Sequence, residues 1–350
     1  MGAYHIGVAA CLIDQKKIQP QQFDAPLEYS SSNAQVFERF TGVSAGALVS
    51  SSIVCGVRMK DDAMNILFNI TSDLRKKCGM LDALTPGYSL LDELERKMLP
   101  TLKAALNNGD DDLFRRRVAN GRLRIGFSDV KEMKTCLLGL GTRLKDLKQA
   151  SYRYVDKFDV VEDVVAASII SSYIPGVTGP LRPFSENLNT AIMRSAFLLD
   201  ERKSQICDYD GNSAYIFQEN EKIDAKEKIN LIDGGVVNMW PSFDNQTTIV
   251  SPLSGSFTPN PNISPCRTEQ TEHSNESNSK LTPWATNIKI KDLGGNIEVD
   301  MSKDNIGTLK RMLVSSTNDE LEIRFENGYE DAKQFLDKRG LLEVFSKPSI

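Results

Sequence analysis

The sequence predicts an α/β fold in which helices cover both faces of a mainly parallel central sheet, giving three layers. Apolar helical stretches alternate along the chain with short runs rich in β-branched and aromatic residues, the pattern of parallel strands joined by helices. Residues 42–46 match G-x-S-x-G, the pattern of a sharp turn between a strand and a helix. A chain of 350 residues is also long enough to bury one large core.

The first elements are predicted around that turn. Residues 4–13 are apolar and predict a helix that carries His5. Residues 36–40 (VFERF) predict a short strand entering the turn. Residues 45–57 (AGALVSSSIVCGV) lack proline and predict a helix of small residues behind it. Glycine on both sides of the serine suggests a crowded backbone where any side chain would clash.

Later elements follow the same alternation. Residues 123–127 (LRIGF) and 152–155 predict strands. Residues 159–172 begin with the D-x-x-E spacing of a capping box and predict a helix, which a Pro-Gly pair then ends. Residues 254–286 are rich in Ser, Thr, Asn and Pro, so we expect a flexible loop. Residues 287–350 are expected to form a C-terminal extension.

In this extension, residues 288–299 alternate like a strand, and residues 329–344 predict an amphipathic helix. The main domain is therefore expected over residues 1–253.

Ser44, at the centre of the turn, is the candidate nucleophile. A serine hydroxyl needs a neighbouring base to take its proton, most often histidine. The chain has only two histidines. His273 lies in a polar run and is expected on a loop, and His5 is expected on a helix face, so a Ser-His-Asp triad is disfavoured.

An acidic residue acting directly as base is the alternative, and Asp233 is the best candidate. It ends the apolar run Ile229–Ile232 and precedes Gly234 and Gly235. Carboxyl ends of strands are where open α/β sheets assemble their sites. An Asp-Gly pair is also common in plain turns, which is the competing interpretation.

Gly42–Gly46 together with Asp233–Gly235 resemble the Ser-Asp dyad of the patatin-like phospholipase family, in the branch of adipose triglyceride lipase and adiponutrin. Flanking segments of this sequence are similar to the same branch: residues 2–12, 164–175 (VVAASIISSYIP), 248–252 and 327–336.

The resemblance implies a patatin-like α/β/α hydrolase acting on lipid acyl esters, with Ser44 as nucleophile and Asp233 as general base. It also implies the amide of Ala45 and a remnant of a glycine-rich loop at Gly2 as oxyanion donors. No cofactor or metal is implied.

The implied substrate is triacylglycerol at lipid droplets or membranes, reached peripherally from the cytoplasm with a protein coactivator. Phospholipid hydrolysis and acyl transfer between glycerides are alternatives, as is a non-catalytic lipid-droplet binding protein.

Two departures from the family pattern bear on this expectation. The family's first strand and glycine-rich loop should precede Gly2, so we expect an incomplete oxyanion hole and weak activity. Residues 185–228 form an insertion that the branch lacks, and we expect a surface excursion with a short helix at 192–199.

Composition and charge bear on the partners, the redox compartment and the membrane segments that the chain can have. A net charge of −5 argues against a nucleic-acid partner, and the charges at residues 110–117 are expected on a solvated helix face. The six cysteines show no C-x-x-C pair, so buried free thiols, as at Cys11 and Cys55, and a reducing compartment are expected. The apolar run at 6–13 is too short to span a bilayer and lacks the basic flank of a signal peptide.

Overall fold

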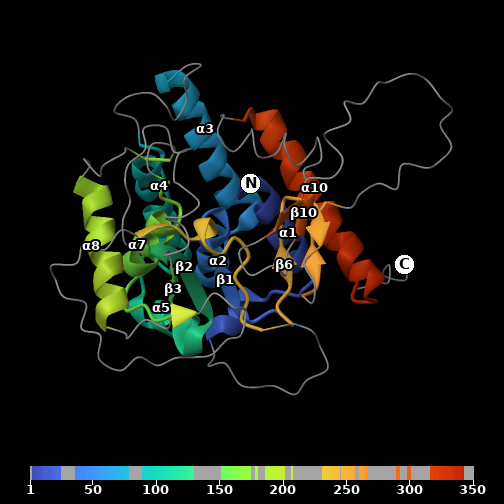
Figure 1. The fold of residues 1–350 in the computed structure, drawn as a ribbon, viewed down its shortest axis with the longest axis horizontal. Helices are drawn as coiled ribbons and strands as arrows, with labels where there is room; N and C mark the ends of the chain where they lie inside the picture. Colours follow the sequence, from blue (N-terminus) through green and yellow to red (C-terminus); the bar gives the residue numbers. More distant parts are fainter. Residues whose placement is uncertain are drawn as a thin grey trace.

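The structure is a computed structural model that describes residues 2–24, 36–78, 89–129, 151–174, 178–179, 186–201, 206–207, 231–244, 246–256, 260–265, 289–291, 298–300 and 316–342. Figure 1 shows a central sheet with helices packed against it. The predicted α/β class is confirmed.

The central sheet is mixed. Its strands are β1 (Phe40–Gly42), β2 (Leu123–Asp129), β3 (Ser151–Val155) and β4 (Ile206–Cys207), neighbours in that order, with β5 (Leu231–Asp233) also paired to β2. The β1–β2 pair is parallel. The β2–β3, β2–β5 and β3–β4 pairs are antiparallel. The expected mainly parallel arrangement is therefore wrong for the described strands.

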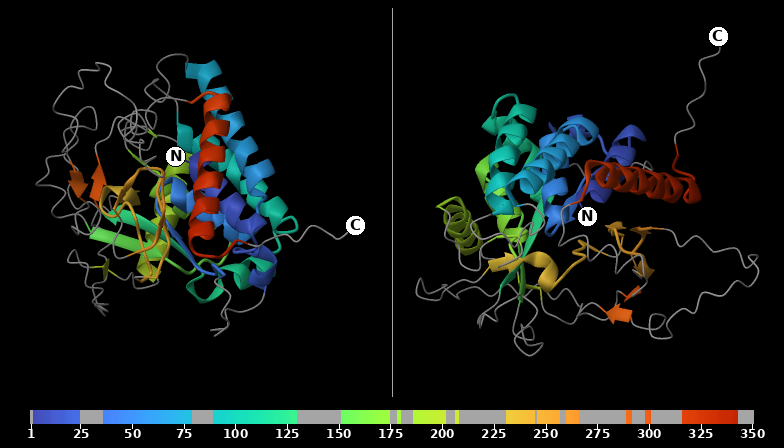
Figure 2. Two further views of the ribbon diagram at one scale, coloured as in Figure 1. Left: turned by 90° about the vertical axis from the view of Figure 1, so that its right-hand side faces the viewer. Right: turned by 90° about the horizontal axis from the view of Figure 1, so that it is seen from above.

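The α-helices of the described residues are α1 (Gly2–Asp14), α2 (Ala45–Cys55), α3 (Met64–Cys78), α4 (Leu90–Ala105), α5 (Asp111–Val118), α7 (Val161–Ser171), α8 (Glu186–Glu201) and α10 (Asn318–Lys338). Helices α1 and α2 carry almost no charge, and α7 is charged only in its first turn, at Glu162 and Asp163. All three are buried nearly all round, as expected for helices inside a core. Helices α2 and α7 pack on the sheet and on each other, with α8 beside α7 and α1 beside α2 (Figure 2). These helices lie on one face of the sheet, and the described residues do not include the helical layer that was expected on the other face.

Two small sheets follow β5. One contains β6 (Ile249–Val250) parallel to β8 (Asn262–Ile263), and the other has the order β7 (Gly255–Ser256), β10 (Glu298–Asp300), β9 (Lys289–Lys291). Strands β7 and β8 fall within the segment expected to be a flexible loop, and Ile263 is buried in the core. Residues 266–288 of that segment lie outside the described residues.

Helix and strand ends differ from the predicted ones for local reasons. Strand β1 begins at Phe40, since residues 36–39 form no ladder. Helix α7 begins at Val161, and the carboxylate of Asp163 accepts hydrogen bonds from the backbone N–H groups of Asp159 (2.9 Å) and Val160 (3.2 Å). The capping acid is therefore Asp163, whereas Glu162 forms an ion pair with Lys103 of α4.

Helix α10 begins at Asn318, eleven residues before the predicted start. Its capping box joins Thr317 and Glu320, whose side chain and backbone N–H groups bond reciprocally. This T-x-x-E signal is visible in the sequence but was not used in the prediction.

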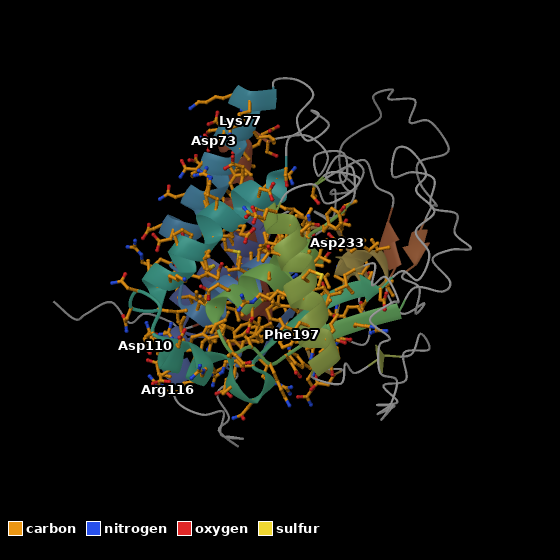
Figure 3. The ribbon with its side chains drawn as sticks, turned by 90° about the vertical axis from the view of Figure 1, so that its left-hand side faces the viewer. Asp73, Lys77, Asp110, Arg116, Phe197 and Asp233 are labelled. Carbon is orange, nitrogen blue, oxygen red and sulfur yellow. The ribbon has the colours of Figure 1, made fainter. Side chains whose placement is uncertain are left out.

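Helix α8 occupies the first part of the predicted surface insertion, yet it is part of the core. Leu188, Ala191, Leu198 and Leu199 are buried, because one face of the helix packs against α7. Only its outer face is exposed, as Phe197 shows (Figure 3). The expected surface excursion is therefore wrong for residues 186–201, and residues 208–230 lie outside the described residues.

The predicted solvated face at residues 110–117 is wrong for Arg117. Its guanidinium is buried against Asp24 (2.7 Å) and donates a hydrogen bond to the carbonyl oxygen of Cys55 (2.6 Å). The expected burial of Cys11 and Cys55 as free thiols is confirmed. Burial raises the pKa of each thiol to about 12.

Helices α1 and α10 cross at very close range (Figure 2). A Cβ atom on Gly7 would overlap the carbonyl group of Phe325, and one on Gly328 would overlap that of Tyr4. One tyrosine from each helix also reaches the opposite helix: Tyr4 donates a hydrogen bond to Asp331 (2.8 Å), and Tyr329 donates one to Asp14 (2.9 Å). The helix near the end of the described chain therefore holds the helix at its start.

We expect Gly328→Ala to destabilise the protein by at least about 2 kcal/mol, because the added methyl group meets backbone that cannot rotate away. Gly2→Ala is the matched control, since its Cβ would sit at an ordinary 3.6 Å from Leu67. Urea unfolding followed by circular dichroism measures both variants. Equal stability of the two variants would contradict the close crossing.

Candidate active site

The site forms where two strands end against the same edge of β2. Gly42, the last residue of β1, pairs with Ile125, and Asp233, the last residue of β5, pairs with Phe127. Strand β3 pairs with the opposite edge of β2 at these positions, so β1 and β5 share one edge. Because β1 runs parallel and β5 antiparallel to β2, their carboxyl ends meet beside Gly126.

Ser44 stands on the turn that leaves β1 and begins α2 at Ala45. Its backbone has φ 52° and ψ −128°, a left-handed conformation that costs a side-chain-bearing residue roughly 1–3 kcal/mol. Such strain persists only where the surroundings impose it. The predicted strand–turn–helix context of Ser44 is present in the structure.

The two flanking glycines are not equivalent. A Cβ on Gly42 would overlap the backbone of Gly46 and Ala47, so only glycine fits there. A Cβ on Gly46 would meet nothing within 4 Å. The expectation that a side chain would clash at either glycine is therefore wrong for Gly46, whose hydrogen atoms face a cavity.

Asp233 points its carboxylate at Ser44. The Ser44 side chain and the N–H of Gly235 (2.8 Å) both hydrogen-bond to it. The residue is only 3% exposed, and it is labelled in Figure 3. Burial raises the pKa of Asp233 to about 6, against the lowering effect of the two hydrogen bonds. The two residues that the sequence singled out are thus in direct contact.

The turn after Asp233 is fixed by close packing. A Cβ on Gly234 would overlap the carbonyl oxygen of Gly126 and the Val43 side chain, which explains the first of the two glycines. The hydroxyl of Ser128 donates to the carbonyl oxygen of Gly234 (3.2 Å) and accepts from the N–H of Val237 (3.1 Å). Sequence analysis missed Ser128, since a lone serine in a strand carries no recognisable signal.

The predicted oxyanion donors are placed differently. Ala45 is the first residue of α2, so its N–H has no acceptor within the helix and lies beside Ser44. Gly2 begins α1 and faces Leu67 of α3; no contact that the structure describes joins it to Ser44. Both roles stay predictions.

Among the described residues, Ser44 and Gly235 are the groups that hydrogen-bond to Asp233, and His5 is not one of them. His5 lies on α1 as expected, with its ring edge-on to Tyr4. His273 lies outside the described residues.

A cavity of about 480 Å³ opens beside the serine turn, a size typical of small-molecule sites. Gly42, Val43 and Gly46 form its wall next to Ser44. Its other walls come from α1 and the turn after it, residues 36–41, α2 and the segment after β5. Their apolar side chains include Val8, Leu12, Ile18, Val49, Ile53, Met239 and Trp240. Sequence analysis did not predict this cavity, because its walls come from segments far apart in the chain.

Within the residues described, no cluster of His, Cys, Asp or Glu has the arrangement of a metal site. No helix among them is long and apolar enough to cross a bilayer.

Comparison with known proteins identifies the family of this chain. A family model described as patatin-like phospholipase matches residues 1–242. The chain is 22% identical over 344 residues to patatin-like phospholipase domain-containing protein 2 of Mus musculus and of Rattus norvegicus, and 21% identical to that of Bos taurus. These matches cover 98% of this chain but only 49–50% of the relatives, so the chain spans about half their length. No solved structure gives a significant match.

We expect Gly42→Ala to lower the free energy of unfolding by about 2 kcal/mol or more, because the turn must move to admit the methyl group. Gly46→Ala should change it by less than about 1 kcal/mol, since the methyl group enters open space and alanine favours the helix. Urea denaturation of the two variants tests this difference. A large loss of stability in both would show that the second glycine is also sterically required.

Asp233→Asn should make the protein more stable at pH 8 but not at pH 4. The folded-state pKa of about 6 lies above the ordinary value of 3.8, so the neutral carboxyl stabilises the fold below pH 4, and that contribution is lost as the pH rises through 6. About 2 pK units correspond to roughly 3 kcal/mol. Melting temperatures of both proteins at the two pH values measure the effect. A variant less stable than the wild type at pH 8 would show that the charge itself supports the fold.

Proposed function

Because the chain belongs to the patatin-like phospholipase family over residues 1–242, we propose that it is a lipid acyl-ester hydrolase that works through a Ser44–Asp233 dyad. The observation that carries the proposal is the hydrogen bond between Ser44, on its strained turn, and the buried carboxylate of Asp233. Family membership alone implies a lipid acyl hydrolase. The dyad assigns the chemistry to two residues of this chain.

The proposed reaction uses the carboxylate as base. With a pKa of about 6, Asp233 is ionised at neutral pH and is more basic than an exposed aspartate, which suits a general base. It takes the hydroxyl proton as the Ser44 oxygen attacks the ester carbonyl. The proton then passes to the departing alcohol, leaving an acyl-serine. Water attacks this intermediate with Asp233 again accepting its proton, and the carboxylic acid leaves as Ser44 is reprotonated.

Negative charge develops on the carbonyl oxygen of the ester when Ser44 attacks, and it must be stabilised by hydrogen-bond donors that are in position before the reaction. The N–H of Ala45, at the N-terminal end of α2, is one donor in this proposal, and Gly2 is the other residue that the resemblance suggests. The apolar cavity beside Gly46 would hold the acyl chain, because its walls offer hydrocarbon side chains to a hydrocarbon ligand.

For the substrate we propose triacylglycerol, reached peripherally on lipid droplets or membranes from the cytoplasm, with a protein coactivator. The chain matches about half the length of the relatives named above, and this similarity supports a lipid acyl ester as the class of substrate. It does not by itself select triacylglycerol. Phospholipid hydrolysis and acyl transfer between glycerides use the same dyad and are the alternatives to be separated by assay.

Labelling of the purified protein by a fluorophosphonate probe should occur at Ser44. Ser44→Ala should abolish labelling, and Asp233→Asn should slow ester hydrolysis by about 10³-fold or more, as when triad members are removed. Ser52→Ala is the matched control on the same helix, because its hydroxyl only bonds back to Leu48. Oleate release from triolein emulsions and from dioleoylphosphatidylcholine vesicles identifies the substrate, and the rate should fall as the pH drops below about 6.

Undiminished labelling of Ser44→Ala would overturn the nucleophile. A folded wild-type protein that binds triolein emulsions without labelling or hydrolysis would instead be a lipid-binding member of the family.

A further inference from the structure

The C-terminal turn of α7 contacts the backbones of both proposed dyad residues. The N–H of Ser44 donates to the Ser171 side-chain oxygen (3.0 Å) and to the Ser171 carbonyl oxygen (3.1 Å). Two residues later, the carbonyl oxygen of Tyr173 accepts the N–H of Asp233 (2.9 Å). A single turn of chain therefore holds the amide of the nucleophile and the amide of the base.

We propose that Ser171 is a positioning residue for Ser44, and that Ser171 and the carbonyl oxygen of Tyr173 together set the separation between Ser44 and Asp233. This inference rests on the proposed function, since it concerns how that dyad is held.

The direction of the hydrogen bonds is defined by the surroundings of Ser171. Its side chain is fully buried, and its hydroxyl donates to the carbonyl oxygen of Gly126 (2.7 Å). The hydroxyl proton is thereby committed to β2, and a lone pair is left for the Ser44 N–H. Gly126 is the residue of β2 at which the ends of β1 and β5 meet. The Ser171 hydroxyl thus links the Ser44 turn to Gly126 of β2 through two hydrogen bonds.

The hydrogen bond between the Ser44 N–H and the Ser171 hydroxyl matters because the backbone of Ser44 is strained. A positive φ at a serine needs partners that oppose relaxation, and the Ser44 N–H has two of them on Ser171. Replacing the hydroxyl by a hydrogen atom removes one acceptor from Ser44 and one donor from Gly126. The turn can then relax, and a shift of about 1 Å in a reacting group can reduce a rate by about 10²-fold.

Neighbouring serines on α7 do not have this arrangement. Ser168 bonds Ser51 of α2, and the hydroxyl of Ser172 bonds back to the carbonyl oxygen of Ser168. Ser172 is also buried. Ser172→Ala therefore removes a buried hydroxyl from the same turn without touching Ser44, and it is the matched control.

The test compares Ser171→Ala with Ser172→Ala in the full chain, beginning with a measurement that needs no activity. Hydrogen exchange at the Ser44 amide should become at least about 10-fold faster in Ser171→Ala, because a hydrogen bond to that amide is lost, and stay unchanged in Ser172→Ala. If Ser171→Ala does not fold, Ser171→Cys, which keeps the volume but has a weaker donor, takes its place.

Reactivity and its pH dependence give the second measurement. Fluorophosphonate labelling should slow by about 10- to 100-fold in Ser171→Ala only. The acid limb of its pH profile should move to higher pH, because the Ser44 hydrogen bond that lowers the pKa of Asp233 is weakened. A merely structural hydroxyl would not move that limb.

Unchanged exchange at the Ser44 amide, or equal changes in the two variants, would overturn the inference. Failure of the wild-type protein to label would count against the proposed function, and the exchange comparison would still decide whether Ser171 holds the turn.

Discussion

The site depends on one constraint, the meeting of two strand ends along a single edge of β2. Gly42 and Asp233 pair with β2 residues that are two positions apart, so whatever follows each strand must share the space beside Gly126. Glycine is required there on both approaches, since Gly42 faces the start of α2 and Gly234 faces the carbonyl of Gly126. Contact between a serine and an aspartate almost 190 residues apart follows from this pairing rather than from any local sequence feature.

The residues of this contact could be predicted because each has a local signal. A serine between glycines after a strand, and an aspartate before two glycines, are patterns set by backbone geometry within a few residues. The same locality explains the success with the helix that follows Ser44 and with the buried thiols. Ser171 and Ser128 carry no such signal, since their roles come from bonds to residues distant in the chain.

Features that depend on tertiary packing were predicted poorly. Strand direction in the sheet was mispredicted because alternating helical and strand patterns do not reveal that β5 runs against β2. Residues 186–201 are expected at the surface as part of an insertion that the related branch lacks, whereas Leu188 and Leu198 pack into the core. Arg117 was expected in solvent, but it satisfies a buried carbonyl next to Asp24. In each case, strand direction or burial is determined by the residues that a segment contacts in the fold, and not by its own sequence.

The crossing of α1 and α10 joins residues more than 320 positions apart, and it has a consequence for synthesis on the ribosome. Helix α1 is apolar nearly all round, and it is synthesised well before its partner α10, which begins about 300 residues later in the chain. At roughly 5–20 residues per second, the face of α1 that packs on α10 stays exposed in the nascent chain for tens of seconds. The α1–α10 crossing can therefore form only after α10 has been made, and holdase chaperones have a long interval in which to bind α1.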